Sequence, residues 1–186
     1  MSAKKNLFFV VFTAGALSVC GQQVKGWEFN TAGDFEGWFD HENRMIEKQV
    51  SGGALQFSVR NQMDPQWRLN LGSLDARYDW IFEVVVRRVS GSSKAQPAFF
   101  VLNGNTDVQL EPSRNVALAG NNEWQSVKFR YKGGSLSSIT AIRFDPATGQ
   151  NGSWEIDSIS VRDAKESSEA PVILGCLRPG FAVQRS

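Results

Sequence analysis

The stretch ALQFSVR, residues 54–60, alternates apolar and polar side chains one for one. Leu55, Phe57 and Val59 fall on one side of an extended chain, and Arg60 falls on the other side with the two polar residues that precede it. A period of two residues is typical of a β-strand that buries one face and leaves the other in water. The stretch therefore predicts a strand at the surface of a packed core.

The same period recurs along most of the chain between residues 27 and 162. It is found in QWRLNL (66–71), YDWIFEVVVRRV (78–89), PAFFVLN (97–103), DVQL (107–110), WQSVKFRYK (124–132), ITAIRF (139–144) and SWEIDSISVR (153–162). In the longest run the pattern sets Tyr78, Trp80 and Phe82 on the inward side. Turn signals rich in Gly, Asn and Ser separate the runs.

No long segment shows a sustained helical period, and only DFEGWFDHENRM (34–45) favours a single helical turn. The number of runs indicates about eight to ten short antiparallel strands, which close a core best as two stacked sheets. The sequence therefore predicts an all-β fold, a jelly-roll β-sandwich of two antiparallel sheets, over residues 24–163.

The beginning of the chain has a different character. Lys4 and Lys5 precede an apolar run over residues 7–19, with small residues after it, which predicts a signal peptide over 1–21 and a secreted or cell-envelope protein. LSVC, ending at Cys20, also resembles a bacterial lipoprotein signal, so lipid anchoring through Cys20 is an alternative to simple cleavage. In neither case do we expect a transmembrane span in the mature protein.

The other end and the overall charge exclude several classes of function. Residues 164–186 begin as a polar Ser/Glu stretch without period, so we expect a disordered tail or a linker there. This tail holds Cys176, the only other cysteine, and we expect no disulfide within the domain. A formal net charge of +1 and no cluster of Lys and Arg argue against a nucleic-acid partner.

Three segments resemble a known family. WEFNTAGDFEGW (27–38), VSGGALQFSV (50–59) and IRFDPATGQNGSWEIDSISV (142–161) are similar to the galactose-binding-like β-jelly rolls found in secreted carbohydrate-binding modules. The resemblance implies a non-catalytic domain that binds a polysaccharide or glycan. It also implies that Trp27 and Phe29 alternate with Glu28 in a first strand and that Trp38 closes one end of the sandwich; we expect Trp27, Trp38 and Trp124 to be buried.

In the resembling modules a calcium ion often joins an acid of the first strand, loop oxygens and an aspartate of the last strand. Residue by residue, Asn30 and Asp157 stand at the two strand positions, and Glu36 supplies an anion from the loop between them, with Asp34 and Asp40 as alternatives. The resemblance thus implies a possible structural calcium on Asn30, Glu36 and Asp157. The alternative is that these acids cap turns.

A glycan site needs exposed rings and planar polar groups, which bind the apolar face and the hydroxyls of a sugar. The residues that the outward strand phases and loops offer for this are Arg60, Arg68, Asn70, Glu83, Arg87, Phe100, Arg130, Arg143 and Trp154. Several of them are expected to line one sheet face, and the arginines suit an acidic or sulfated glycan. The alternative is a solvated surface of paired charges. Under the first interpretation, Arg68 and Arg143 are exposed and contribute little to stability.

Nothing in the sequence points to catalysis. His41 is the only histidine, and neither a second metal-ligating histidine nor a serine-nucleophile motif accompanies it. We therefore expect a binding domain. The alternatives are a structural or adhesive envelope domain that binds protein, and an accessory domain of a larger glycoside hydrolase.

Overall fold

The computed structural model describes residues 23–60, 64–91, 96–112, 122–146 and 151–165, so the predicted leader and most of the predicted tail lie outside it. Its strands are β1 (Gln23–Trp27), β2 (Phe39–Asp40), β3 (Ile46–Ser51), β4 (Ala54–Val59), β5 (Trp67–Leu74), β6 (Trp80–Gly91), β7 (Ala98–Asn103), β8 (Thr106–Pro112), β9 (Gln125–Tyr131), β10 (Ile139–Asp145) and β11 (Gly152–Asp163). The expected helical turn is a 3₁₀ turn, η1 (His41–Asn43).

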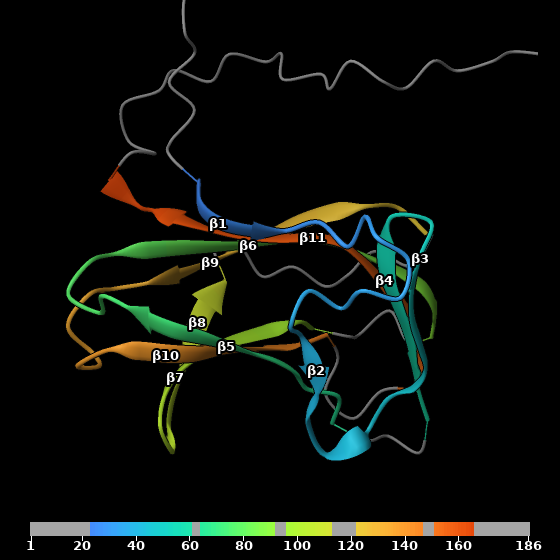
Figure 1. Ribbon diagram of the computed structural model, residues 1–186, viewed down its shortest axis with the longest axis horizontal. Helices are drawn as coiled ribbons and strands as arrows, with labels where there is room; N and C mark the ends of the chain where they lie inside the picture. The colour runs from blue at the N-terminus through green and yellow to red at the C-terminus, as the bar shows by residue number, and fades with distance from the viewer. Residues whose placement is uncertain (1–22, 61–63, 92–95, 113–121, 147–150, 166–186) are drawn as a thin grey trace, which may run out of the picture.

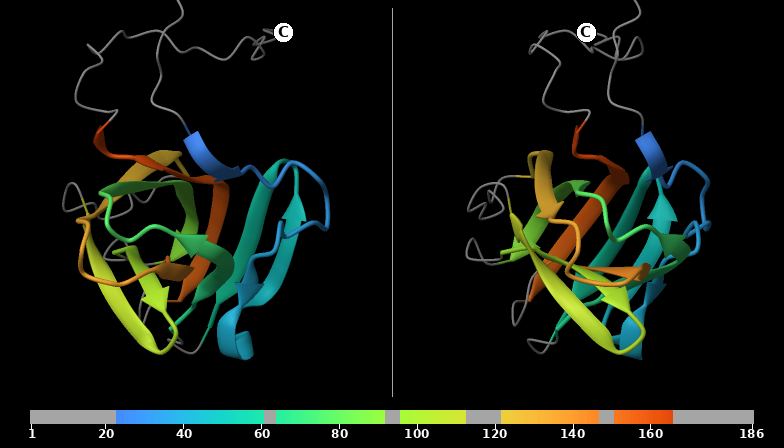
Figure 2. Two further views of the ribbon diagram at one scale, coloured as in Figure 1. Left: turned by 60° about the vertical axis from the view of Figure 1, so that its left-hand side comes forward. Right: turned by 90° about the vertical axis from the view of Figure 1, so that its left-hand side faces the viewer.

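The strands form two antiparallel layers, which Figures 1 and 2 show from three sides. One layer, the β10 sheet, has the order β2-β5-β10-β7-β8, and the other, the β6 sheet, has the order β9-β6-β11-β4-β3, with β1 also paired to β11. A short pairing of β8 with β9 joins the two layers into one curled sheet. The predicted all-β jelly-roll sandwich is confirmed.

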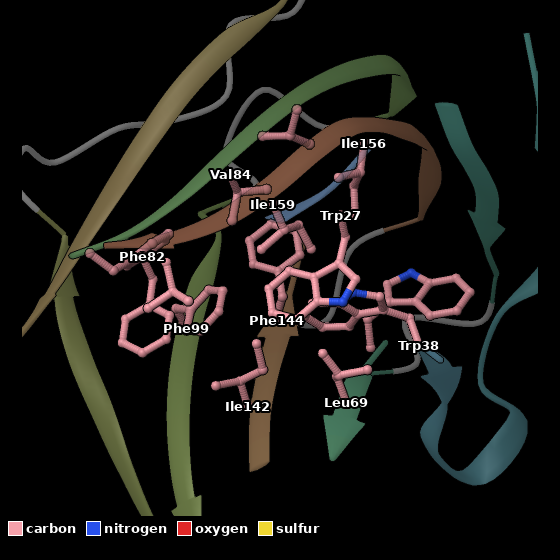
Figure 3. Close-up of a cluster of buried hydrophobic side chains, with 14 of the residues drawn as sticks. Trp27, Trp38, Leu69, Phe82, Val84, Phe99, Ile142, Phe144, Ile156 and Ile159 are labelled. Carbon is pink, nitrogen blue, oxygen red and sulfur yellow. The ribbon is translucent and has the colours of Figure 1, made fainter. Parts of the chain in front are cut away.

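Aromatic side chains fill the space between the two layers (Figure 3). Phe99 of the β10 sheet lies 5.0 Å from Phe82 of the β6 sheet between ring centroids, and Trp154 of β11 stacks on Phe57 at 6.0 Å. Burial of apolar surface stabilises a fold by about 25 cal/mol per Å², so rings of this size dominate the core. The alternating patterns of β4 and β6 are confirmed, since their inward residues are buried.

The segment that follows β1 departs from the predicted first strand. Strand β1 ends at Trp27, and Phe29 lies outside it with a positive φ of 51°, although its ring is fully buried. The Glu36 carboxylate accepts hydrogen bonds from the backbone N–H groups of Glu28 (3.0 Å) and Phe29 (2.8 Å). It thereby takes the place of the partner that a neighbouring strand would otherwise give these N–H groups. The prediction of a strand through residue 29 was therefore wrong.

The two tryptophans that bracket this segment are buried as predicted. Trp27 and Trp38 meet edge to face with their ring centroids 5.6 Å apart. Gly37 directs the chain into this contact, because its φ of +84° is open mainly to glycine and a Cβ there would lie 3.2 Å from the Leu69 side chain. Tyr78, by contrast, was predicted to point inward and is 44% exposed just before β6 begins.

Candidate functional site

Five side chains form a row across the outer face of the β10 sheet. The strand register pairs Phe39 with Arg68, Arg68 with Arg143, Arg143 with Phe100, and Phe100 with Gln109. Residues directly opposite on neighbouring strands point to the same face of a sheet. The residues next to them along the strands, among them Trp67, Phe99 and Phe144, are buried in the core, so the row faces outward. We call these five residues the transverse row.

An aromatic ring lies on each side of the two arginines in the transverse row. Phe39 is 41% exposed. Phe100 is partly buried, because the Arg143 guanidinium covers its ring at 3.8 Å from the centroid. An arginine stacked on a ring combines a cation–π contact with a flat surface, and both kinds of group bind planar or apolar ligand faces.

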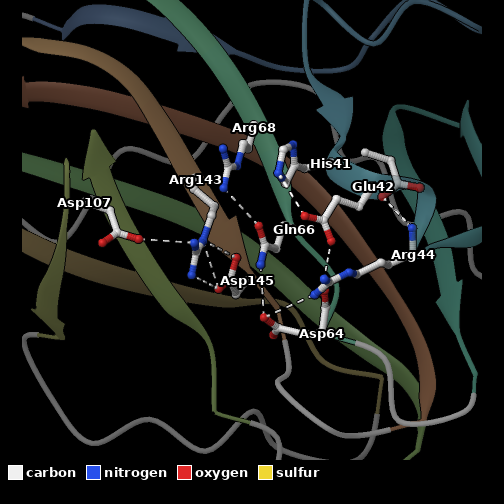
Figure 4. A network of polar contacts seen from close by, with 10 residues as sticks. His41, Glu42, Arg44, Asp64, Gln66, Arg68, Asp107, Arg143 and Asp145 are labelled. Carbon is white, nitrogen blue, oxygen red and sulfur yellow. Dashed lines mark hydrogen bonds and ion pairs between the residues drawn. The ribbon is translucent and has the colours of Figure 1, made fainter. Parts of the chain in front are cut away.

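Two carboxylates hold Arg143 in place (Figure 4). Its Nε donates to both oxygens of Asp145 at 3.0 and 3.1 Å, and its Nη2 donates to Asp145 Oδ2 at 2.8 Å. Its Nη1 donates to Asp107 of β8 at 3.4 Å. Asp145 is 2% exposed, so this pair is largely removed from water and fixes the guanidinium over Phe100.

Asp145 carries a perturbed titration. Burial raises the pKa of its carboxyl group to about 6, and this effect outweighs the hydrogen bonds and positive charge of Arg143, which lower the pKa. In the folded protein the carboxyl group therefore holds its proton more tightly than it does in the unfolded chain.

We predict that this group makes the protein less stable as pH rises from about 4 to about 6. In that window the unfolded carboxyl group ionises while the folded one stays protonated, and above it the full loss of about 2–3 kcal/mol is present. Urea unfolding of the wild type at steps between pH 4 and pH 7 measures the slope. The Asp145→Asn variant should flatten it, and an equal slope in both proteins would contradict the assignment.

A second group of polar side chains extends from Arg68 through Gln66 to Asp64 and Arg44 (Figure 4). Its Nη2 donates to Gln66 Oε1 at 3.2 Å, and the Gln66 amide donates in turn to Asp64 at 3.0 Å. Arg44, after η1, pairs with Glu42 and lies 3.7 Å from Asp64. The loop before β5 and the turn η1 are therefore tied together beside the transverse row.

His41 directly follows β2 as the first residue of η1, next to this group. Its backbone N–H donates to the Gln66 carbonyl at 2.9 Å. Burial, followed by the positive charge of Arg68, lowers the pKa of His41 below its usual range, so the imidazole is neutral at pH 7.

The structure divides the predicted ligand residues between two faces. Arg68, Asn70, Phe100 and Arg143 are on the strands of the β10 sheet, whereas Glu83, Arg87 and Arg130 are on the β6 sheet and Arg60 directly follows its strand β4. The expected single face therefore does not contain the whole set. Of the first group, Arg68, Phe100 and Arg143 belong to the transverse row, and Asn70 is on the same sheet.

The outer face of the β6 sheet is a surface of paired charges. Arg87 donates to Glu155 at 2.7 Å, Arg130 pairs with Asp79 at 2.9 Å, and Arg60 pairs with Glu47 at 3.2 Å. Glu83 accepts a hydrogen bond from Ser126 and lies 3.8 Å from Lys128. A shallow hollow of about 200 Å³ lies on this face; Gln49, Gln56, Ser58, Ser153 and Glu155 are among its lining residues. Such cross-strand pairs are common on solvated sheet faces.

Two predictions about tryptophan were wrong. Trp154 was expected at the site, but it is fully buried (0% exposed) and packs on Phe57 in the core. Trp124 was expected in the core, but it is 41% exposed, with the Arg87 guanidinium 4.4 Å from its ring centroid. Trp154 has the same phase as the inward residue Ile156, whereas Trp124 has the phase opposite to the inward residue Val127. These phases are the sequence signals that distinguish the buried tryptophan from the exposed one.

Three residues of the site were not predicted: Phe39, Gln109 and Asp145. Phe39 belongs to a strand of two residues, which is too short to show a period. Asp145 is the last residue of β10 and the first of the DP turn signal, where an acid is ordinarily a turn residue. Its partnership with Arg143, two residues earlier on the same face of β10, is the signal that reveals it.

The residues proposed for calcium have other partners. Both oxygens of Glu36 accept backbone hydrogen bonds, the Asn30 amide nitrogen donates to Glu28 at 2.9 Å, and Asp157 accepts a hydrogen bond from Ser158 at 3.2 Å. Within the described ranges, no group of three or more His, Cys, Asp and Glu side chains is arranged to hold a metal ion. Calcium on Asn30, Glu36 and Asp157 stays a prediction.

The described part of the chain holds no helix long and apolar enough to cross a membrane.

No protein-family model matches the chain, and no curated protein matches its sequence. Solved structures do resemble it. The CBM22-1 xylan-binding domain of Paenibacillus barcinonensis Xyn10C is 17% identical, with 77% of this chain and 95% of that chain covered and a TM-score of 0.58. The CBM22-1–GH10 modules of Clostridium thermocellum endo-1,4-beta-D-xylanase 10B, complexed with xylohexaose, are 14% identical over 76% of this chain and 28% of that chain, with a TM-score of 0.56.

A variant of a family 29 carbohydrate-binding module, complexed with cellulohexaose, is 13% identical over 80% of this chain and 99% of that chain, with a TM-score of 0.51. Likeness at these identities concerns the fold, because unrelated functions share folds of this type. The chain therefore has the β-jelly-roll fold of these modules, as the resemblance in its sequence predicted.

Proposed function

We propose that this protein is a non-catalytic glycan-binding domain whose binding surface is the outer face of the β10 sheet. The transverse row is the observation that carries the proposal. It places an exposed ring, two guanidinium groups, a second ring and an amide side by side on five neighbouring strands. These are the groups that stack on a sugar ring and hydrogen-bond to its hydroxyls.

The length of the row suits an extended ligand. Neighbouring strands lie about 4.8 Å apart, so five strands give a row about 19 Å long. A polysaccharide chain running across the strands would meet Phe39 first, then the arginines, and then Phe100 and Gln109. The ion pairs of Arg143 hold this part of the row before any ligand arrives, which lowers the entropy lost on binding.

The ligands of the structural neighbours support the same class. One neighbour is described as xylan-binding, and two others were solved with xylohexaose and with cellulohexaose. We therefore propose a polysaccharide as the partner. The signal-like leader supports the further proposal that the domain acts outside the cytoplasm, either secreted or held at the cell envelope through Cys20.

Affinity gel electrophoresis with xylan, a soluble cellulose derivative and an acidic polysaccharide tests the proposal. We expect at least one of them to retard the wild-type protein. The double variant Phe39→Ala/Phe100→Ala should bind that polysaccharide about tenfold more weakly or worse, because it loses both rings of the row. The control is Tyr78→Ala, since the Tyr78 ring is about as exposed as that of Phe39 but lies outside the transverse row.

The variants must keep the wild-type melting transition within a few degrees for the comparison to count. Equal retardation of the double variant and the wild type would move the glycan site away from this face. If no polysaccharide retards the folded protein, glycan binding is wrong and a protein partner becomes the better hypothesis.

A further inference from the structure

The two arginines at the centre of the transverse row differ in their partners. Arg143 donates to two carboxylates and is only 12% exposed as a side chain. Arg68 stands directly opposite it on β5, yet within the described residues it pairs with no carboxylate. Among the described residues, its one hydrogen bond runs to the neutral amide of Gln66.

Arg68 keeps unused donors inside the face. A guanidinium carries five N–H groups, and the Nε of Arg68 is buried without a partner. Gln66 holds its side-chain oxygen toward Arg68, because its amide nitrogen donates to Asp64. It accepts from Nη2 of Arg68 and leaves the buried Nε unpaired. A partly buried guanidinium with so few partners is costly unless something else completes its hydrogen bonds.

Arg68 forms no ion pair of its own within the described residues, although Asp145, Asp107 and Glu42 attract its charge from farther away. Burial and then the charge of Arg143 lower the pKa of Arg68 from its usual value, and the group still remains protonated at pH 7. These three carboxylates already pair with other arginines, Asp145 and Asp107 with Arg143 and Glu42 with Arg44. His41 is neutral at pH 7 and adds no charge. The internal segments outside the described ranges contain no Asp or Glu.

We infer that Arg68 is an anchor for an anionic group, and that the glycan bound on this face carries carboxylate or sulfate substituents. The inference rests on the proposed function and names the class of its ligand. A planar guanidinium matches a carboxylate with two parallel hydrogen bonds, and partial burial strengthens them. Phe39 beside Arg68 offers a ring on which the sugar that carries the charge can stack.

The test compares four ligands on the full protein: polygalacturonate as a carboxylated glycan, a sulfated galactan, and neutral xylan and hydroxyethylcellulose. We expect the carboxylated or the sulfated glycan to bind more tightly than both neutral ones. Arg68→Gln should weaken that binding by about ten- to hundredfold, the effect of losing a charge-assisted hydrogen-bonded pair. The control Arg130→Gln removes the same charge from the outer face of the β6 sheet and should leave binding unchanged.

Each outcome decides the matter. Equal binding of neutral and anionic glycans, with no effect of Arg68→Gln, would overturn the anionic class and leave the glycan-binding function standing. Equal losses in Arg68→Gln and Arg130→Gln would mean general attraction between a cation and a polyanion, which also overturns the inference. Failure of all four ligands would overturn the inference and the proposed function together. Binding of only one anionic glycan, lost in Arg68→Gln alone, would support the inference and identify the anionic group.

A second variant protects the test against a folding defect. Arg68→Lys keeps the charge but replaces the planar guanidinium, which can donate two parallel hydrogen bonds, by a compact ammonium. It should therefore bind the anionic glycan more weakly than the wild type and more tightly than Arg68→Gln. If both variants, Arg68→Gln and Arg68→Lys, bound the anionic glycan as tightly as the wild type, Arg68 would make no contact with the ligand.

Discussion

Replacing Trp154 with alanine is expected to cost about 3–5 kcal/mol of unfolding free energy, the range for deleting a large aromatic side chain from a core. Trp154 is fully buried, stacks on Phe57 and sits in the middle of the β6 sheet on β11, so little could collapse into the space. The total free energy of unfolding of a domain of this size is only about 5–15 kcal/mol. A large fraction of the stability would therefore be lost, as measured by urea unfolding at constant pH.

The matched variant is Trp124→Ala, which deletes the same side chain from an exposed position beside Arg87. We expect a loss of less than about 1 kcal/mol, because exposed substitutions have small effects. Trp154→Phe should fall between the two. Similar losses for both tryptophans, or a larger loss for Trp124, would contradict the placement of β11 and β9.

Arg143→Ala is expected to destabilise the protein by about 3–5 kcal/mol at pH 7.5, since it strands the buried Asp145 carboxylate without its partner. The loss should shrink at pH 5, where the Asp145 carboxyl group is protonated and no longer carries a charge. Unfolding in urea at the two pH values measures both effects. The expectation from the sequence that Arg143 is exposed was wrong, since its side chain is 12% exposed, and this variant tests the expectation that it contributes little to stability.

Arg130→Ala is the control, because Arg130 is 62% exposed and pairs with Asp79 in water. Its loss should stay below about 1 kcal/mol at either pH. If Arg143→Ala lowered the free energy of unfolding no more than Arg130→Ala does, the ion pair of Arg143 and Asp145 would not stabilise the site. A loss independent of pH would separate the destabilisation from the charge of Asp145.

The sequence was sufficient for the strands and for most of the core. Alternation in β4 and β6 identified Leu55, Phe57, Phe82 and Val84 correctly, because a period of two residues directly reports one buried face. It failed where the phase changes within a strand. A register shift between Ile156 and Ser158 moves the inward side of β11 from even to odd residues, and a local pattern does not show that.

The site was harder to predict because it is made by strand order. Arg68 and Phe100 lie on the same face only because β10 inserts between β5 and β7, a pairing that joins distant parts of the chain. Outward phase alone could not distinguish them from Arg87 or Arg130, which have the same pattern and belong to the opposite surface. The burial of Asp145 likewise depends on packing that its position in a turn signal conceals.

Chemical-shift mapping tests the central claim most directly. The ¹⁵N-labelled protein is titrated with xylohexaose, with cellulohexaose and with an oligogalacturonide, and the backbone amides and the Trp124 indole N–H are followed. We predict that the shifts concentrate on β2, β5, β10 and β7, around Phe39, Arg68 and Phe100, while the Trp124 indole on the opposite face stays unchanged. Shifts centred on β6, β9 and β11, with the Trp124 indole moving first, would contradict the account.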